Sequence, residues 1–278
     1  DELVRLPGAA NPLYLKIVLS EMRVFGAFAG LQEKILKDFG DGPVSAFQSL
    51  LRRLESDAAY SAIRPAEIVP WLFGLLAHAH QGLAIEELVE IITPNLRFEG
   101  GAPERREVEE ALHRILRQVR PFLSRRSGRY DFFYESFKLA AAARYAAHEP
   151  GRPAPAARAA ALETGYTAPA ASVTAPEPGR PASAWHSLLA DYFDGRPTWQ
   201  EGLERQPNAR KTAELPYHLA LADRHQRIAQ LLTDFDFLEA KISAGQIFEL
   251  LEDYRRVGAS RLDPAPQAQS AEVPAALV

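Results

Sequence analysis

Few side chains in this sequence stand at the spacings that catalysis or metal binding requires. The chain has no glycine-rich phosphate loop ending in Lys-Ser or Lys-Thr, no Gly-x-Ser-x-Gly and no His-Glu-x-x-His. It has no cysteine, which excludes disulfide frameworks, thiolate catalysis and cysteine-containing zinc sites. His78 and His80 are two residues apart in an expected helix, so they point to different faces. We therefore expect no catalytic residue, no metal site and no nucleotide hydrolysis by this chain alone.

Asn11 and Pro12 open an apolar helical pattern, and their residue types allow two interpretations. Asn is a favoured N-cap and Pro is tolerated at the first helical position, so an ordinary helix start explains both residues. Alternatively, the rigid ring of Pro12 offers a flat apolar contact to a nucleotide base. Capping alone favours the first interpretation.

The residues Arg125, Arg126 and Arg129 form a basic hairpin around the tight-turn pair Ser127-Gly128. Such a hairpin could insert into a nucleic-acid groove as a wing. However, the helix expected to enter the major groove carries four carboxylates between Glu104 and Glu110, and the whole chain has a formal net charge of −4. Both charges oppose contact with phosphates. We therefore favour a solvated hairpin and argue against nucleic acid as the partner.

The composition is that of a globular protein, with 47% hydrophobic and 24% charged residues. The longest near-apolar run, Ile68 to His78, is too short to cross a bilayer, and the N-terminus lacks the pattern of a secretory signal. Together with the absence of cysteine, these features predict a cytoplasmic protein without a membrane partner. Because the sequence opens at Asp1 without an initiator Met, we expect it to be part of a longer polypeptide.

The apolar periodicity predicts a mainly α fold with two helical regions at its start. Residues 1–57 contain amphipathic patterns typical of a small helical bundle, including helices at 13–25 and 31–39. Residues 58–148 contain three helices, two short strands at 121–125 and 129–134, and a last helix from Ser136 to about His148. That order, helices followed by a β-hairpin, is typical of a winged helix. We expect the last helix to pack Phe137, Leu139 and Tyr145.

Two segments poor in large apolar residues flank a third helical region. Residues 149–184 are rich in Pro and Ala and predict a flexible linker, and residues 259–278 predict a disordered tail. Between them, residues 185–258 predict successive short helices joined by short loops. We expect these helices to form an arm of antiparallel helical hairpins.

Several of these stretches match a known family in order and spacing. Asn-Pro-Leu-Tyr-Leu-Lys at 11–16 precedes an apolar helix, and Phe-Phe-Tyr-Glu-Ser-Phe at 132–137 follows a hairpin. Further along are Trp-His-Ser-Leu-Leu-Ala-Asp-Tyr-Phe at 185–193, Glu-Leu-Pro-Tyr-His-Leu at 214–219 and Asp-Phe-Leu-Glu-Ala-Lys at 236–241. In this order they resemble the STAND class of signalling NTPases, which includes the NACHT and NB-ARC proteins. The likeness covers residues 1–147 and 185–257.

The resemblance implies a role for each stretch. The first would open the small helical domain after the nucleotide-binding domain, with Asn11 and Pro12 on the adenine side. The second resembles the winged-helix His motif and would put Tyr134 on the phosphate side. The last three resemble the helical arm that precedes repeat sensors in bacterial members. The chain departs from the family at Asn11, where Gly is common, and at Tyr134, where His normally contacts the ADP β-phosphate. A tyrosine can donate a hydrogen bond but carries no positive charge near neutral pH.

The resemblance implies the regulatory segment of a STAND-type NTPase that contributes to nucleotide-dependent autoinhibition and oligomerisation. The implied partners are an upstream nucleotide-binding domain in cis, a C-terminal repeat sensor in cis and further copies of the chain on activation. ADP or ATP with Mg would be bound by the full-length parent, and this chain would hold no cofactor itself. A winged-helix transcription regulator that binds DNA is the first alternative. A helical protein-interaction scaffold is the second.

Overall fold

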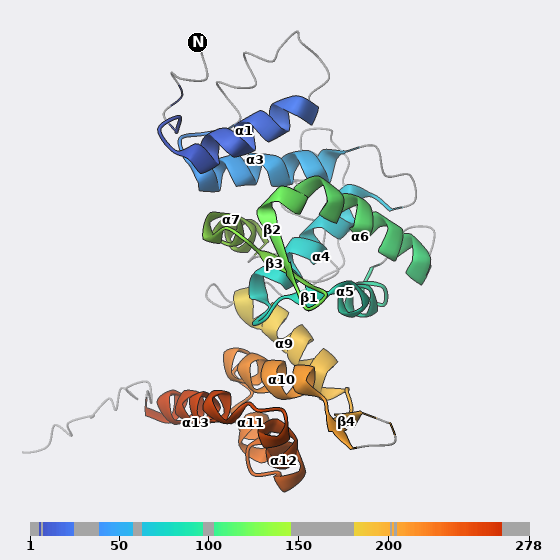
Figure 1. Cartoon of the computed structure of the whole chain (residues 1–278), viewed down its shortest axis with the longest axis vertical. Helices are drawn as coiled ribbons and strands as arrows, with labels where there is room; N and C mark the ends of the chain where they lie inside the picture. Colours follow the sequence, from blue (N-terminus) through green and yellow to red (C-terminus); the bar gives the residue numbers. More distant parts are fainter. Residues whose placement is uncertain are drawn as a thin grey trace, which may run out of the picture. The chain divides into compact units, whose positions relative to one another are not determined.

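The computed structural model describes residues 6, 8–24, 39–57, 63–96, 103–145, 181–200, 202 and 205–262. The chain divides into two compact units, Asp1–Tyr192 (unit 1) and Phe193–Val278 (unit 2). Figure 1 shows the elements of each unit. Of the helix predicted at 31–39 only Phe39 is described, and of the linker predicted at 149–184 only its last four residues. The domain boundaries drawn from the sequence remain predictions.

Unit 1 begins with two helices that pack on each other, as their apolar stripes predict. These are α1 (Pro12–Val24) and α3 (Pro43–Ser56). The start of α3 combines Pro43 at its first position with Ser45, whose Oγ accepts a hydrogen bond from the Gly42 N–H at 3.1 Å. The buried apolar side chains of α3 include Phe47, Leu50, Leu51 and Leu54. The Phe47 ring stacks on Phe137 at a centroid distance of 4.4 Å, which joins this pair to the next group of elements.

The rest of unit 1 combines helices with a small sheet. In chain order the elements are α4 (Pro65–His78), β1 (Leu83–Ala84), α5 (Ile85–Ile92), α6 (Arg105–Val119), the 3-10 helix η2 (Arg120–Phe122), β2 (Leu123–Arg126), β3 (Arg129–Phe132) and α7 (Glu135–Tyr145). The predicted hairpin is present, with Arg126 opposite Arg129 and with Ser127 and Gly128 both at positive φ. β2 begins two residues later than predicted and ends one residue later, whereas β3 begins at the predicted Arg129 and ends two residues earlier.

The sheet has a third strand that the sequence did not indicate. β1 pairs antiparallel with β3, so the strand order is β1-β3-β2. Two residues are too few to show an alternating pattern, and the pairing partner is far away in the chain. Gly82 makes the approach possible, because it has φ +68° and an added Cβ would lie 2.4 Å from the Tyr130 carbonyl oxygen.

One buried residue was predicted wrongly on α7. Phe137 and Tyr145 are fully buried, but Leu139 is 53% exposed. The buried stripe of α7 runs through Phe137, Ala141 and Tyr145, which are spaced by four residues. Leu139 lies two residues from the start of that stripe and therefore faces the other side of the helix.

Ion pairs between helices fix the packing of unit 1. Arg53 on α3 donates to both carboxylate oxygens of Glu21 on α1, at 2.5 and 3.0 Å. Arg53 also donates to the Gln118 side chain of α6 at 2.8 Å. Because Glu21 is buried, this bidentate partner compensates the cost of removing its charge from water. α1, α3 and α6 are thereby held in one arrangement.

α9 (Pro181–Asp194) begins four residues before the arm predicted from residue 185. Its Trp185 is fully buried in unit 1, where the indole Nε1 donates to the Tyr145 carbonyl oxygen at 3.1 Å. The same ring meets Trp71 of α4 edge to face, at a centroid distance of 5.6 Å. Trp185 is therefore a core residue of unit 1.

Unit 2 is a series of short helices with one small ribbon. Its elements are β4 (Trp199–Gln200), β5 (Gln206–Pro207), α10 (Ala209–Leu221), α11 (His225–Leu231), α12 (Phe235–Ser243) and α13 (Ile247–Leu262). α10 contacts α11, α12 and α13 and is therefore the centre of the unit. α13 continues to Leu262, four residues into the segment for which the sequence predicted a disordered tail.

Buried charges in unit 2 are paired. Glu214 is fully buried, accepts from Arg210 at 2.8 Å and lies 3.0 Å from the Nε2 atom of the buried His218. Lys241 is also fully buried and lies 2.7 Å from Asp253. Each pair links neighbouring turns or helices, so these polar residues have a packing role in the arm.

The fold is mainly helical with small antiparallel sheets, in agreement with the predicted fold class. Within the described ranges, no helix combines the length and the apolar character needed to span a membrane.

Candidate functional site

The start of α1 has the geometry of a capped helix. The Asn11 Oδ1 atom accepts hydrogen bonds from the backbone N–H of Leu13 at 2.9 Å and of Tyr14 at 3.3 Å. Asn11 is thus the N-cap that the sequence predicts. Pro12 is exposed, so its ring remains accessible on the surface of unit 1. The capping role of Asn11 and a contact of Pro12 with a ligand are therefore compatible.

Tyr14 holds the start of α1 in place. Its ring is fully buried, and its hydroxyl donates to the Gly40 carbonyl oxygen at 2.8 Å. Burial and the nearby Asp41 carboxylate raise the pKa of Tyr14, so the hydroxyl stays a donor. On the other side of the ring, a Cβ added to Gly8 would lie 2.8 Å from ring carbons, so the backbone there packs directly on Tyr14. The exposed residues of α1 are thereby presented from a fixed helix.

Lys16 connects α1 to Tyr134, 118 residues away in the sequence. The Lys16 ammonium donates to the Tyr134 hydroxyl at 3.1 Å and lies 3.4 Å from the Pro121 carbonyl oxygen. It also lies over the rings of Tyr134 and Phe122, at 5.3 and 5.6 Å from their centroids. Because Pro12 and Lys16 are four residues apart on one helix, they share a face. The structure therefore brings Pro12, Lys16 and Tyr134 onto one surface.

Tyr134 stands at the junction between the hairpin and α7. The Tyr134 carbonyl oxygen accepts from the Phe137 N–H at 3.0 Å, which starts the helix. Its ring lies 6.4 Å from that of Phe122 and 4.8 Å from that of Phe133, a side chain that is 64% exposed. Since Lys16 donates to the Tyr134 hydroxyl oxygen, the hydroxyl proton is left to donate outward.

Lys16 and Tyr134 together make a small cationic donor site. Tyr134 is itself neutral, but the structure places the Lys16 ammonium beside it. Sequence reasoning did not assign a role to Lys16, although it belongs to the Asn-Pro-Leu-Tyr-Leu-Lys stretch. The only sequence signal was its position one turn after Pro12. An ammonium next to a hydroxyl can bind an anion, but it supplies no nucleophile and no acid–base pair.

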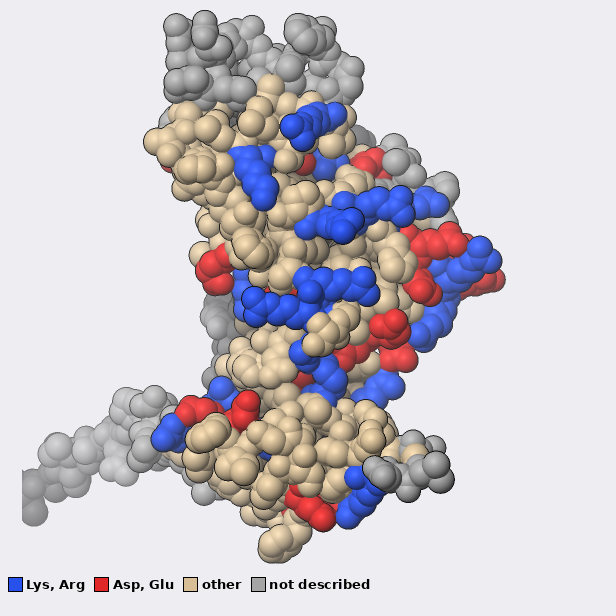
Figure 2. All heavy atoms as spheres, in the orientation of Figure 1, with Lys and Arg blue, Asp and Glu red and all other residues tan. Residues whose placement is uncertain are grey.

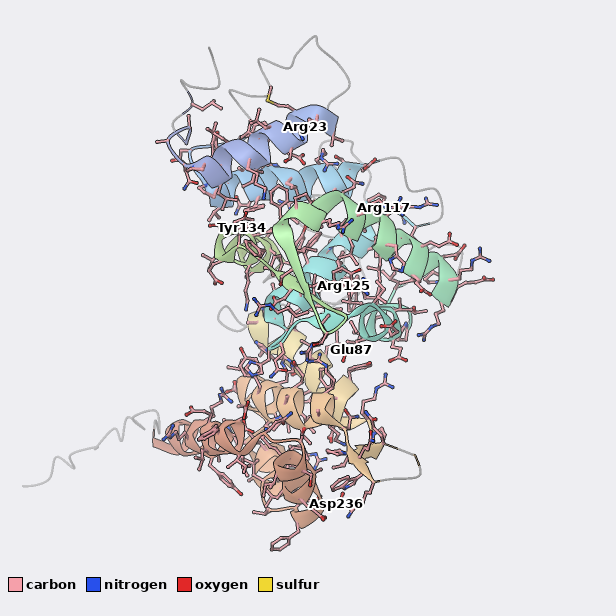
Figure 3. The ribbon with its side chains drawn as sticks, in the orientation of Figure 1. Arg23, Glu87, Arg117, Arg125, Tyr134 and Asp236 are labelled. Carbon is pink, nitrogen blue, oxygen red and sulfur yellow. The ribbon has the colours of Figure 1, made fainter. Side chains whose placement is uncertain are left out.

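The basic hairpin is partly occupied by contacts within the protein. The Arg125 guanidinium lies over the Tyr130 ring at 5.3 Å from its centroid, and Arg129 donates to the Gln81 side chain at 3.2 Å. Arg126 is exposed near the turn. Figure 3 shows Arg125 on the same side of unit 1 as Tyr134 and Arg117. The structure therefore does not bring the three hairpin arginines together as one uniform wing.

The carboxylates in the first turns of α6 contact groups of the same helix or its N-cap. The Glu107 side chain accepts from the Glu104 backbone N–H at 3.0 Å, and Glu110 pairs with Arg106 at 2.9 Å. Figure 2 shows Asp and Glu side chains gathered where α6 begins, whereas Lys and Arg side chains spread over the face made by α1, the end of α6 and the hairpin. The carboxylates of α6 thus lie in its first half, whereas arginines stand near both of its ends. Among the described residues, no group of three or more His, Cys, Asp or Glu side chains could hold a metal ion.

Comparison with known families gives one match. Residues 187–271 match the family model of the APAF-1 helical domain, which is less than a third of the chain's 278 residues. This segment comprises the end of α9 and nearly all of unit 2. Comparisons with curated proteins and with solved structures found no match. The match supports a relationship at family level to APAF-1-like and NB-ARC-like STAND proteins, and it suggests a regulatory part of such a signalling NTPase.

Proposed function

We propose that this chain contributes to the nucleotide-dependent switch of a STAND-type signalling NTPase and holds its off state. The observation that carries the proposal is the match of residues 187–271 to the APAF-1 helical domain. The order of elements in unit 1 supports it, because α4, β1, α5 and α6 are followed by the β2–β3 hairpin. Helices followed by a hairpin that shares a sheet with β1 are what a winged helix requires.

In this proposal, a nucleotide-binding domain in the same polypeptide binds ADP or ATP with Mg. The surface made by the exposed Pro12 and Lys16 and the half-buried Tyr134 would face that nucleotide, with Pro12 toward the base and the other two residues toward the phosphates. Lys16 supplies the positive charge that Tyr134 lacks, and the Tyr134 hydroxyl supplies a donor. An ammonium and a hydroxyl 3.1 Å apart fit a phosphate oxygen as their common acceptor.

The switch would depend on contacts between unit 1 and the nucleotide that form in one state and not in the other. With ADP bound, unit 1 would close on the nucleotide through Lys16 and Tyr134. A signal received at a C-terminal repeat sensor would separate them, allow nucleotide exchange and expose surfaces for assembly with further copies in the cytoplasm. A ligand shifts such an equilibrium only as far as it binds one state more tightly than the other. The Lys16–Tyr134 pair is the candidate for that difference.

The charge distribution favours this role over DNA binding. The beginning of α6, which a DNA-reading winged helix would place in the major groove, carries the exposed Glu104, Glu109 and Glu110. These groups would lie close to phosphates and would repel them. The hairpin arginines could still touch phosphate, but contacts to the backbone alone would carry no sequence preference.

The test is the rate at which ADP leaves the full-length polypeptide that contains this chain. Lys16→Gln removes the charge, and Tyr134→Phe removes the hydroxyl while keeping the ring. A charge-assisted hydrogen bond is worth about 1.5–3 kcal/mol, so each change should speed ADP release about tenfold or more. Arg23→Gln is the matched control, because Arg23 is an exposed cation on the same helix. Unchanged ADP release in folded Lys16→Gln and Tyr134→Phe proteins would remove this surface from the switch.

A further inference from the structure

Unit 1 contains a pocket that the proposed switch does not use. It lies between the second half of α6, η2 and the β2–β3 hairpin, and its volume is about 380 Å³. Its lining consists of His113, Leu116, Arg117, Arg120, Leu123, Ser124, Arg125 and Tyr130. Neither Lys16 nor Tyr134 belongs to this lining. A volume within the 300–1,000 Å³ common for small-molecule sites is large enough for more than a single ion.

The charged side chains that line the pocket are cationic. Three arginines, Arg117, Arg120 and Arg125, line it, and no carboxylate is among the lining residues. Arg117 and Arg120 form no ion pair within the described ranges. The Arg125 guanidinium lies over the Tyr130 ring, which is an uncharged partner. His113 adds a ring nitrogen, whose contact with the exposed Glu109 is 3.8 Å long. Elsewhere in unit 1, arginines such as Arg53 and Arg144 are paired with carboxylates.

The arrangement of these side chains follows from the fold. Arg117 lies one turn after His113 on α6, so the two share a face of that helix. Arg120 opens η2, and Arg125 stands on β2 opposite Tyr130 of β3. Three separate elements thus present their cations to one hollow, although like charges repel when they are brought together. An anion that fills the hollow would relieve that repulsion.

We propose that this pocket binds a phosphorylated small molecule. The planar guanidinium fork suits the oxygens of a phosphate group, and a phosphomonoester carries about −1.5 to −2 charges at neutral pH. Several arginines around one hollow match such a multivalent anion better than a single carboxylate. Leu116 and Leu123 give the pocket an apolar part, and the Ser124 hydroxyl gives a neutral donor. The remainder of the ligand beyond its phosphate would contact these side chains.

Pyrophosphate is the probe for the test, because it offers two adjacent phosphates without an organic part. Calorimetric titration of the full chain at low salt should give one site, and pyrophosphate should raise the thermal unfolding midpoint. Arg117→Gln and Arg120→Gln should each weaken binding about tenfold, the cost of one charge-assisted contact. Arg114→Gln is the matched control, since Arg114 is an exposed arginine of α6 outside the lining. It should leave the affinity unchanged, and circular dichroism should show that all variants fold.

Four outcomes would overturn the proposal. The absence of pyrophosphate binding is the first. Equal weakening by Arg114→Gln and Arg117→Gln is the second, because it would show attraction to the general charge of the face. Citrate that binds as tightly as pyrophosphate would make the pocket a carboxylate site. Duplex DNA that binds more tightly than pyrophosphate, with the same dependence on Arg117 and Arg120, would assign the cations to a nucleic-acid surface.

Discussion

Replacing Gly74 with Ala tests whether α9 is packed against α4 as the structure shows. Gly74 lies in the middle of α4, and a Cβ added there would be 2.4 Å from the Cζ2 atom and 2.6 Å from the Cη2 atom of Trp185. Carbon atoms in contact are separated by about 3.5–4.0 Å, so the indole would have to move by about 1 Å or more. It is not free to do so, because Nε1 is bonded to the Tyr145 carbonyl oxygen and the ring meets Trp71.

Two opposing terms set the size of the effect. Overpacking of a filled core costs about 1–3 kcal/mol. Ala in place of Gly in a helix interior gains about 1 kcal/mol. We therefore expect Gly74→Ala to lower the free energy of unfolding by up to about 2 kcal/mol, which is the difference between the two terms. In a Trp185→Leu background the clashing ring atoms are gone, so Gly74→Ala should instead stabilise the protein.

The assay is urea unfolding followed by circular dichroism for the four proteins of this double-mutant cycle. The coupling free energy between positions 74 and 185 should be about 1–3 kcal/mol. Gly258→Ala on α13 is the control for helix propensity, because an added Cβ there meets nothing within 4 Å. If Gly74→Ala alone stabilises the protein as Gly258→Ala is expected to do, Trp185 does not pack on Gly74 and the reasoning is wrong.

Two further predictions concern polar contacts, one in each unit. Tyr145→Phe removes a buried hydroxyl that donates to Glu55 at 2.6 Å, so it should lower the free energy of unfolding by about 1.5–3 kcal/mol. An unchanged urea midpoint would contradict this. In unit 2, the hydrogen bond from Arg227 holds the pKa of Asp194 below its usual range. The ionised carboxylate therefore stabilises the fold above about pH 4, and that contribution is lost as the pH falls through the lowered pKa. Between neutral and acidic pH, the thermal unfolding midpoint should fall less in Arg227→Gln than in the wild type. An equal fall in the two proteins would refute the role of Arg227 in stabilising the Asp194 carboxylate.

Local patterns in the amino-acid sequence predicted helices that the structure contains, and the hairpin turn. Apolar residues repeat every three to four positions in α3 and α6. This repeat can be read from the sequence without knowing what the helix packs against. Ser127-Gly128 likewise predicts the turn locally, because two residues at positive φ are needed there. The capping role of Asn11 follows from the same local chemistry. The resemblance to STAND proteins was also a sequence-level prediction, and the match of residues 187–271 supports it in part.

Contacts between residues far apart in the sequence follow from the packing of the folded chain. The pairing of β1 with β3 and the contact of Lys16 with Tyr134 each join segments that are far apart in the chain. No local pattern encodes such a contact, since it depends on how helices and strands pack after they have formed. The pocket at Arg117 is lined by residues 113–130, which lie on successive elements of the chain. The exposure of Leu139 also follows from packing, because only one of the two apolar sides of α7 lies against the core. Packing of distant elements therefore set the chemistry of the Lys16–Tyr134 site, whereas local periodicity set the elements that carry both residues.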